Sequence, residues 1–98
     1  MWRNRQGKFK SKFFKDIGKV KEDREIMTAL YKVFVNVEKA EHVDEINNIK
    51  PLEKFDSRWR IKLFLDKKRD YRIGLYIHGK TVWFSRFLHR KKIYDENW

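Results

Sequence analysis

The sequence predicts an α+β fold in which an N-terminal strand and a helical hairpin pack on one face of a small, mainly antiparallel four-stranded sheet. Two patterns lead to this prediction. Apolar residues recur every three or four positions between Asp23 and Ala40, which is typical of an amphipathic helix. Apolar and polar residues alternate strictly over 58–65 and 70–77, which is typical of half-buried strands. Because both kinds of element have one apolar face, we expect the helices to cover the sheet.

The first half of the chain is expected to supply the strand and the helices. Lys8–Lys10 alternates like a short strand, and Ser11 is positioned to cap the helix that follows. That helix has an apolar side formed by Phe13, Phe14, Ile17 and Val20. Asp23 is positioned to cap a second helix, whose apolar stripe consists of Ile26, Leu30, Val33, Val37 and Ala40. One helical turn is expected at 43–46, and an irregular segment at 49–55.

Alternation also predicts how the later strands pair. A hairpin in which Asp66 faces Asp70, with 67–69 as its loop, places the two apolar faces together. The next turn is expected at His78-Gly79, because glycine accepts a positive φ angle. This turn places Leu75 opposite Val82 and Gly74 opposite Trp83, so that the indole of Trp83 lies over the glycine backbone.

The second face of the predicted sheet is basic and aromatic. It is expected to contain Arg60, Lys62, Phe64, Arg72, Gly74, Tyr76, Thr81, Trp83, Ser85 and Phe87. His89 follows at the strand end, and Arg86 is expected on the helix side at the rim of the sheet. Cations suit phosphates and aromatic rings suit stacked bases, so the face predicts binding of single-stranded RNA. The alternative is that these rings only cover a solvent-facing sheet.

Composition limits the other classes of function. The formal net charge is +11, and residues 47–98 hold 14 of the 25 Lys and Arg but only 6 of the 14 Asp and Glu. The chain has no cysteine, and its three histidines lack metal-ligand spacing, so we expect no metal and no cofactor. No apolar run approaches the ~20 residues of a membrane span, so the expected compartment is the cytoplasm. We expect a single domain over residues 1–98, with residues 1–7 flexible.

Four short segments occur in a specific order along residues 8–94. They are Val-Glu-Lys-Ala-Glu at 37–41, Ile-Asn-Asn-Ile-Lys-Pro-Leu at 46–52, Asp-Tyr-Arg-Ile-Gly at 70–74 and Arg-Phe-Leu-His-Arg-Lys-Lys-Ile-Tyr at 86–94. With the expected order of elements, they make the chain resemble the RelE/ParE toxin superfamily. The resemblance implies the toxin of a bacterial toxin–antitoxin pair. In the RelE-like branch such toxins are ribosome-dependent endoribonucleases that cut mRNA, and in the ParE-like branch they inhibit DNA gyrase.

The resemblance also implies roles for individual residues. Arg72 falls on a catalytic phosphate contact of the nuclease branch, and His89, Arg90 and Tyr94 fall where that branch often has an acid or base. The family's basic residues in the loop before the sheet fall on Lys50 and Lys54. Its arginine in the strand that follows this loop falls on Arg60. These three residues are expected to bind RNA together with Lys62 and Trp83 of the predicted face, Arg86 at the rim of the sheet, and Arg90. The usual Lys-Gly after the loop leucine is replaced by Glu53-Lys54, which brings a carboxylate near the site.

Cleavage by the RNA 2′-OH needs a base for that proton, an acid for the leaving 5′-oxygen and cations over the phosphate. The hypothesis is that His89 is one proton-transfer group, Tyr94 or Glu53 the other, and that Arg72 and Arg90 stabilise the phosphorane. The alternatives are a surface role for His89, a solvated loop carboxylate for Glu53, and a lid over the sheet edge for Tyr94. A gyrase inhibitor and a non-catalytic RNA-binding domain remain alternative functions.

The resemblance implies partners as well. They are an acidic antitoxin, which the net charge of +11 suits, the ribosome and its mRNA, with no membrane partner. Contact with DNA is expected only through the antitoxin complex.

Overall fold

The computed structural model describes residues 6–55, 57–94 and 97–98. The elements are β1 (Gln6–Phe9), α1 (Ser11–Gly18), α2 (Arg24–Lys39), the 3₁₀ turn η1 (Val43–Glu45), β2 (Ile49–Pro51), β3 (Arg58–Phe64), β4 (Asp70–His78) and β5 (Thr81–His89). The predicted flexibility of residues 1–7 concerns mainly residues 1–5, which lie outside the described residues, whereas Gln6 and Gly7 belong to β1.

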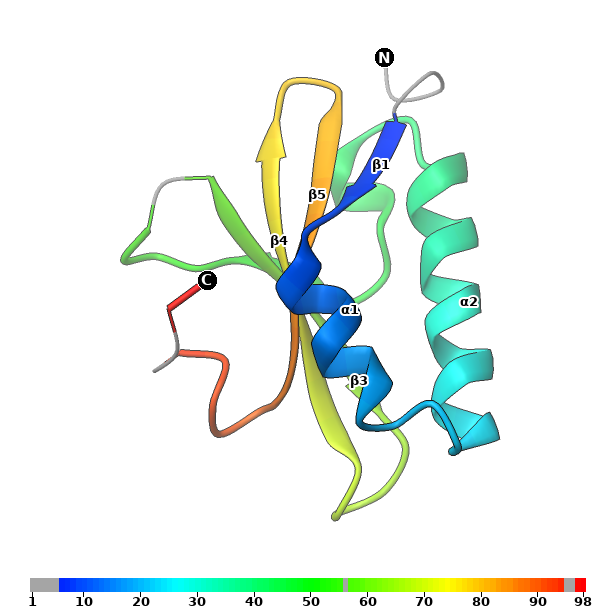
Figure 1. Ribbon diagram of the computed structural model, residues 1–98. Helices are drawn as coiled ribbons and strands as arrows, with labels where there is room; N and C mark the ends of the chain where they lie inside the picture. The colour runs from blue at the N-terminus through cyan, green and yellow to red at the C-terminus, as the bar shows by residue number, and fades with distance from the viewer. Residues whose placement is uncertain (1–5, 56, 95–96) are drawn as a thin grey trace.

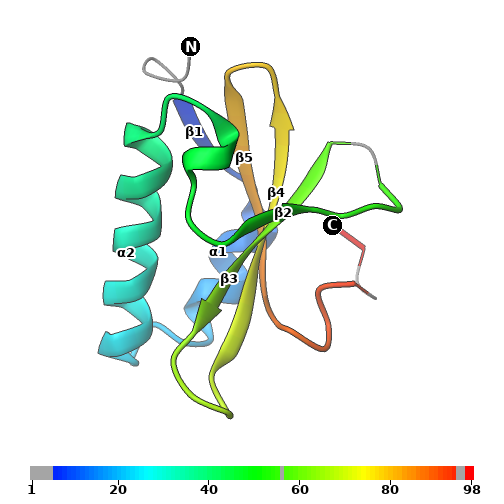
Figure 2. The same ribbon diagram turned by 180° about the vertical axis from the view of Figure 1, so that it is seen from behind.

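The sheet has the order β1-β5-β4-β3-β2, with β1 parallel to β5 and the other pairs antiparallel. α2 lies over one face of the sheet, and α1 lies beside the edge of β5 (Figures 1 and 2). The predicted α+β class is confirmed, but the sheet has five strands instead of four. The additional strand is β2, which lies within the segment 49–55 that was expected to be irregular. Proline is tolerated there because β2 is an edge strand.

The helices form much as predicted. Asp23 caps α2 by accepting hydrogen bonds from the backbone N–H groups of Glu25 and Ile26 at 3.1 and 3.2 Å. The cap of α1 is Lys10 rather than Ser11, and it makes no side-chain capping bond. Phe13 is fully buried, but Phe14 is 59% exposed, so the predicted apolar side of α1 is narrower than expected.

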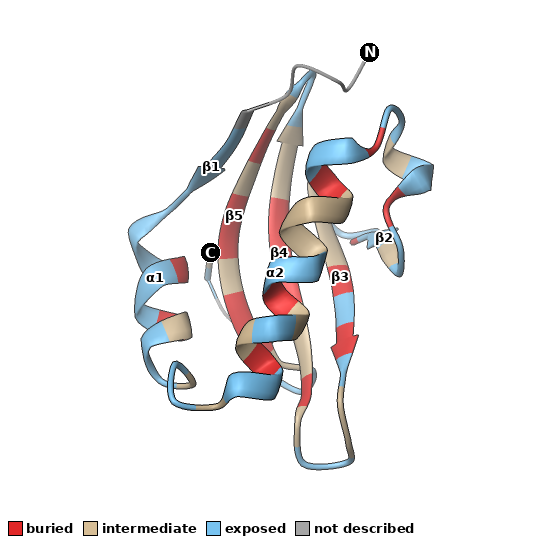
Figure 3. Ribbon diagram, turned by 90° about the vertical axis from the view of Figure 1, so that its right-hand side faces the viewer, coloured by how far each residue is buried: buried red, intermediate tan, exposed pale blue. Residues whose placement is uncertain are grey.

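The main core lies between the helices and the sheet (Figure 3). Phe13 and Ile26 of the helices meet Ile61, Ile73 and Leu75 of the strands, and none of these five side chains is more than 1% exposed. Burying each such side chain contributes about 1.5–3 kcal/mol, so this face of the sheet holds the fold together.

The hairpin between β3 and β4 pairs two residues away from the predicted register. Phe64, not Asp66, faces Asp70, and residues 65–69 form the connection. A shift of two residues leaves every side chain on its predicted face, so hydrophobic alternation could not detect it. Asp66 instead accepts hydrogen bonds inside the loop, and Arg69 forms ion pairs with Asp66, Asp23 and Glu25 that tie the loop to α2.

The hairpin between β4 and β5 also differs from the prediction. The turn is Gly79-Lys80, with Gly79 at φ 57° and His78 opposite Thr81. A β-bulge follows: Leu75 pairs with Phe84, but Gly74 pairs with Arg86. The additional residue in β5 reverses which side chains face the helices from there on. Phe87, predicted on the second face, is therefore buried in the main core at 3% exposure.

The C-terminal segment covers part of the second face, which we call the open face. It lies on the opposite side of the sheet from α2 (Figure 1). Leu52, Leu88 and Ile93 are buried outside the main core cluster. An indole does lie over Gly74, as predicted, but it belongs to Trp98 and not Trp83: a Cβ atom at position 74 would lie 2.6 Å from Trp98 Cζ2.

Candidate active-site cleft

A cleft of about 550 Å³ lies beside β2 and β3 on the open face. Its lining residues come from β2 and the segment after it, from β3 and from the C-terminal segment: Lys50, Pro51, Leu52, Glu53, Lys54, Phe55, Arg60 and Tyr94. The sequence analysis selected five of them for RNA binding or proton transfer, namely Lys50, Glu53, Lys54, Arg60 and Tyr94. The fold therefore gathers residues up to 44 positions apart into one concave site.

The walls of the cleft are held by backbone pairing. Lys50 faces Arg60 across β2 and β3, which places an ammonium beside a guanidinium. Arg60 Nη1 donates a hydrogen bond of 2.8 Å to the carbonyl of Asn48, and this bond orients the guanidinium. Leu52 is buried and its N–H donates to the carbonyl of Arg58, which anchors the segment that carries Glu53 and Lys54. The cations of the cleft thus sit on fixed backbone.

Two groups able to exchange a proton line the same cleft. Glu53 supplies a carboxylate, which accepts protons, and Tyr94 supplies a phenolic hydroxyl, which can donate one. Tyr94 is 54% exposed, so its hydroxyl is not committed to packing. The cleft thus combines three cations, which are suited to an anion, with a carboxylate and a phenol.

Arg72 lies outside the cleft lining, on the same face of the sheet. Its Nη1 donates to Asp70 at 2.5 Å, and its side chain is only 12% exposed. Arg90 approaches the other oxygen of Asp70 at 3.4 Å, and Lys62 pairs with Arg72 across the strands. Burial raises the pKa of Asp70, but the hydrogen bond from Arg72 and the charges of Arg72, Arg90 and Lys62 outweigh it and hold that pKa below the usual range. Asp70 thus forms ion pairs with two predicted phosphate ligands, Arg72 and Arg90, close to a third, Lys62.

His89 lies on the other side of the sheet from Arg72. Its strand partner is Tyr71, and the two rings make an edge contact with centroids 6.1 Å apart. The bulge in β5 causes this placement, because without it His89 would alternate onto the open face. His89 Nδ1 accepts a hydrogen bond from the N–H of Lys91 at 3.3 Å. The structure therefore does not bring this imidazole together with the cleft residues.

Arg86 connects α1 with β5 through side-chain hydrogen bonds. It donates to both carboxylate oxygens of the buried Asp16 in α1, at 2.8 and 3.1 Å, and to the carbonyl of Asn97 at 2.9 Å. Asp16 also accepts the backbone N–H of Phe87 at 2.9 Å. The prediction that Arg86 lies at the rim of the sheet is confirmed, and there it joins α1 to β5.

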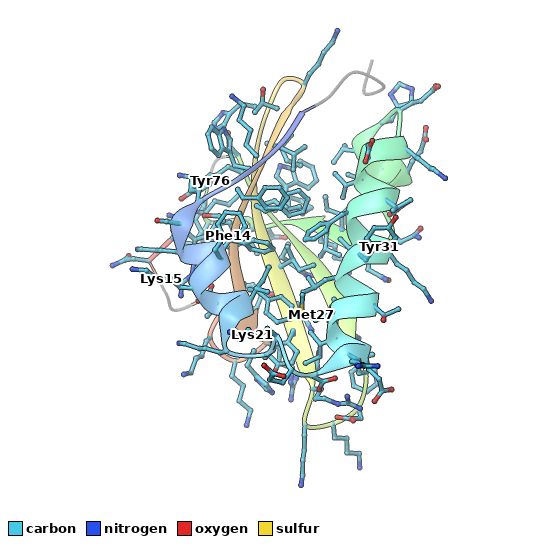
Figure 4. The ribbon with its side chains drawn as sticks, turned by 45° about the vertical axis from the view of Figure 1, so that its right-hand side comes forward. Phe14, Lys15, Lys21, Met27, Tyr31 and Tyr76 are labelled. Carbon is cyan, nitrogen blue, oxygen red and sulfur yellow. The ribbon has the colours of Figure 1, made fainter. Side chains whose placement is uncertain are left out.

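A row of cations and aromatic rings crosses the rest of the open face. Lys8, Trp83, Tyr76 and Arg58 face one another in turn across β1, β5, β4 and β3. Lys8 Nζ lies 5.3 Å from the ring of Trp83, and Arg58 lies 5.4 Å from that of Tyr76. Tyr76 stands on one side of the molecule and Tyr31 of α2 on the other (Figure 4).

Three contributors to this face escaped the sequence analysis. Phe55 lines the cleft, Arg58 stacks over its ring at 4.2 Å, and Trp98 lies 4.9 Å from the same guanidinium. Arg58 is two residues before Arg60 in the predicted strand, so alternation places both side chains on the same face. This pattern could have identified Arg58. Trp98 offered no signal, because no periodic pattern connects it with the sheet.

No family model matches the chain. It is 33% identical over 63 residues to toxin RelE3 of Methanocaldococcus jannaschii, an alignment that covers 60% of this chain and 66% of that toxin. The crystal structure of a RelB–RelE antitoxin–toxin complex from Methanococcus jannaschii is similar with a TM-score of 0.71 and 27% identity, covering 90% of this chain and 95% of that one. The Escherichia coli DinJ–YafQ complex is similar in fold, with a TM-score of 0.69, 13% identity and coverage of 92% and 97%.

Two further features concern only residues 6–55, 57–94 and 97–98. No group of three or more His, Asp and Glu side chains in that part of the chain is arranged to hold a metal ion. Within the same residues, no helix has the length and apolar character needed to cross a membrane.

Proposed function

The chain belongs to the RelE/ParE toxin superfamily, and from that premise we propose that it is the toxin of a type II toxin–antitoxin pair and cuts mRNA on the ribosome. The observation that carries this proposal is the cleft, where Lys50, Lys54 and Arg60 meet Glu53 and Tyr94. Cations for a phosphate beside a proton acceptor and a proton donor are the parts that RNA cleavage requires.

The reaction we propose is attack of the RNA 2′-oxygen on the adjacent phosphorus. The new O2′–P bond forms as the P–O5′ bond breaks, leaving a 2′,3′-cyclic phosphate and a free 5′-hydroxyl. Glu53 takes the proton of the 2′-OH, and Tyr94 gives a proton to the leaving 5′-oxygen. Lys50, Lys54 and Arg60 stabilise the charge that develops on the phosphorane oxygens. Because the nucleophile belongs to the RNA and these three cations supply the positive charge, we propose that cleavage needs no metal ion.

Arg72 and His89 enter this proposal differently from the cleft residues. Arg72 shares the open face, and with Arg90 and Lys62 it forms a cluster whose cations outnumber Asp70. We propose that this cluster holds RNA phosphates next to the cleft. Proton transfer by His89 remains a prediction, and the geometry favours Tyr94 because His89 faces Tyr71 across the sheet.

The proposal includes partners. RelE of the similar crystal structure was solved in complex with the antitoxin RelB, which supports an antitoxin for this chain. We propose an acidic one, because the net charge of +11 favours a negatively charged partner. Action on translating ribosomes would place the protein in the cytoplasm.

The experiment that tests the proposal is primer extension on a message translated by purified ribosomes with the purified chain. We expect defined cuts that need ribosomes and that are unchanged when the purified chain is treated with EDTA and dialysed before it is added to the ribosomes. Tyr94→Phe should slow cleavage about 10²–10⁴-fold, because it removes one proton-transfer group. His89→Gln, on the other side of the sheet, is the matched comparison and should retain most of the activity.

Two outcomes would contradict the proposal. Uncut message, combined with DNA damage responses in cells that express the chain, would favour the gyrase-inhibitor alternative. Cleavage that survives Tyr94→Phe but is lost in His89→Gln would reject the assignment of the acid.

A further inference from the structure

A second concavity on the open face, separate from the cleft, has the composition of a nucleobase site. It has a volume of about 360 Å³ and is lined by Lys10, Tyr76, His78 and Trp83. It shares no lining residue with the cleft. Lys10 lies after β1, Tyr76 and His78 on β4 and Trp83 on β5, so this pocket lies toward the opposite edge of the sheet from β2.

The rings of the pocket are arranged as stacking surfaces. Tyr76 and His78 are nearly parallel, with an interplanar angle of 13° and centroids 6.4 Å apart. Lys10 Nζ lies 4.6 Å from the ring of Tyr76 and 5.9 Å from that of Trp83. Every base presents a π-face, and a lysine beside the rings suits the phosphate that accompanies the base. Among the four lining residues there is no carboxylate to repel that phosphate.

Arg58 connects this pocket with the cleft. Its guanidinium lies 4.2 Å from the ring of Phe55, which lines the cleft, and 5.4 Å from the ring of Tyr76, which lines the pocket. Neighbouring strands are about 5 Å apart, so the step from β3 to β5 is about 10 Å. That distance corresponds to about three stacked nucleotides at about 3.4 Å each.

We propose that the pocket of Lys10, Tyr76, His78 and Trp83 binds a base of the same RNA strand whose scissile phosphate occupies the cleft, with Arg58 contacting the backbone between them. This proposal rests on the proposed function for the identity of the RNA. The site reads no sequence, because stacking and a phosphate contact are available to every nucleotide. Its effect is to lengthen the single-stranded segment that the protein holds.

The test is binding of fluorescein-labelled 2′-O-methyl RNA, measured by fluorescence anisotropy with the purified chain. The 2′-O-methyl groups block cleavage, so binding is measured independently of catalysis. For an eight-nucleotide RNA, Trp83→Ala should weaken binding about fivefold to a hundredfold. Trp83→Phe, which keeps a stacking ring, should restore most of the affinity. Tyr31→Ala is the matched control, because Tyr31 is 67% exposed on α2.

Length dependence separates a stacking site from a general loss of charge or fold. With a two-nucleotide RNA that fills only the cleft, Trp83→Ala and the parent chain should bind equally. Lys10→Gln should reduce the salt dependence of binding by about one phosphate contact for the eight-nucleotide RNA alone.

The proposal is overturned if Trp83→Ala binds the longer RNA as tightly as Tyr31→Ala does, or if the parent chain binds neither RNA. Should cleavage by the parent chain fail while the length-dependent loss in Trp83→Ala holds, the proposed function falls and the pocket stands. Should cleavage hold while that loss is absent, the reverse is true.

Discussion

The helix-covered face and the open face of the sheet are formed by the same strands but differ in how much of each is covered by the rest of the chain. On the helix-covered face, Ile61 and Ile73 are at most 1% exposed and meet apolar side chains of α1 and α2. On the open face, the alternating positions carry Arg60 and Arg72, and the C-terminal segment covers only part of the surface. The helices of the chain bury one face, whereas the other face keeps cations and aromatic rings that a polyanion could contact. Stability and the proposed function therefore depend on opposite sides of the same three strands.

The sharpest test of this division compares one phenylalanine from each face. Phe13→Ala removes a fully buried ring from the main core and should lower the free energy of unfolding by about 3–5 kcal/mol. Phe64→Ala removes a ring that is 53% exposed on the open face and should change it by less than about 0.5 kcal/mol. Urea unfolding followed by circular dichroism measures both. Equal losses would mean that the open face also carries the fold.

The second test looks for the opposite asymmetry, in activity. Arg60→Ala should reduce mRNA cleavage about 10²–10³-fold, because it removes one cation from the proposed phosphate site in the cleft. Its urea midpoint should change little, since the guanidinium makes a single bond to the exposed carbonyl of Asn48. Lys32→Ala on the exposed surface of α2 is the control for loss of one positive charge. Equal activity in the two variants would remove the cleft from the mechanism.

A third test concerns the contact that joins α1 to β5. Asp16→Asn weakens the ion pair with Arg86 while it keeps an acceptor for the N–H of Phe87. We expect a loss of about 1.5–3 kcal/mol in the free energy of unfolding, the usual range for hydrogen bonds to charged groups. Asp44→Asn, at an exposed position of η1, is the matched control. If the two variants unfolded at the same temperature, the buried carboxylate of Asp16 would contribute no more to stability than the exposed one of Asp44.

The smallest effect is expected from the carboxylate of the open face. The pKa of Asp70 in the folded chain lies below its ordinary value of 3.8. Asp70 therefore adds stability above pH 3.8, and this contribution is lost as the pH falls toward the folded-state pKa. The pKa values of Asp23 and Asp66 are also lowered. The main cause is the hydrogen bond from the backbone N–H of Ile26 for Asp23 and the hydrogen bond from the Arg69 side chain for Asp66.

Urea midpoints measured between about pH 5 and pH 2 check this point. They should fall less steeply in Asp70→Asn than in the parent chain. Identical slopes would mean that Arg72, Arg90 and Lys62 do not stabilise the ionised form of Asp70.

Much of this division was readable in the sequence, because alternation determines which side chains share a face. It predicted Arg60, Lys62 and Arg72 on one face and Ile61, Leu63 and Ile73 on the other. The register escaped it, since a slip of two residues preserves every face. Hydrogen bonds between Arg69 and Asp66 close the loop in the observed register, and hydrophobic periodicity contains no information about such contacts.

The bulge and the C-terminal segment mark the limit of sequence reasoning for the site. A single additional residue in β5 moved Phe87 into the core and His89 away from Arg72. A prediction based on strict alternation does not allow for such a bulge. As a result, it placed His89 on the same face as Arg72, whereas the structure places the two side chains on opposite faces. The loop cations and Arg60 did assemble, because β2 pairs directly with β3. Tyr94 joins them from the C-terminal segment that follows β5.

The close approach of Trp98 to Gly74 links two positions that are distant in the chain. A methyl group at position 74 would overlap the indole, with 2.6 Å between Cβ and Cζ2. Substituting the glycine and deleting the tryptophan therefore act through one physical event, the undocking of the C-terminal segment from the sheet. In chains of this architecture, we expect a side chain at the first position to occur only with a smaller residue, or none, at the second.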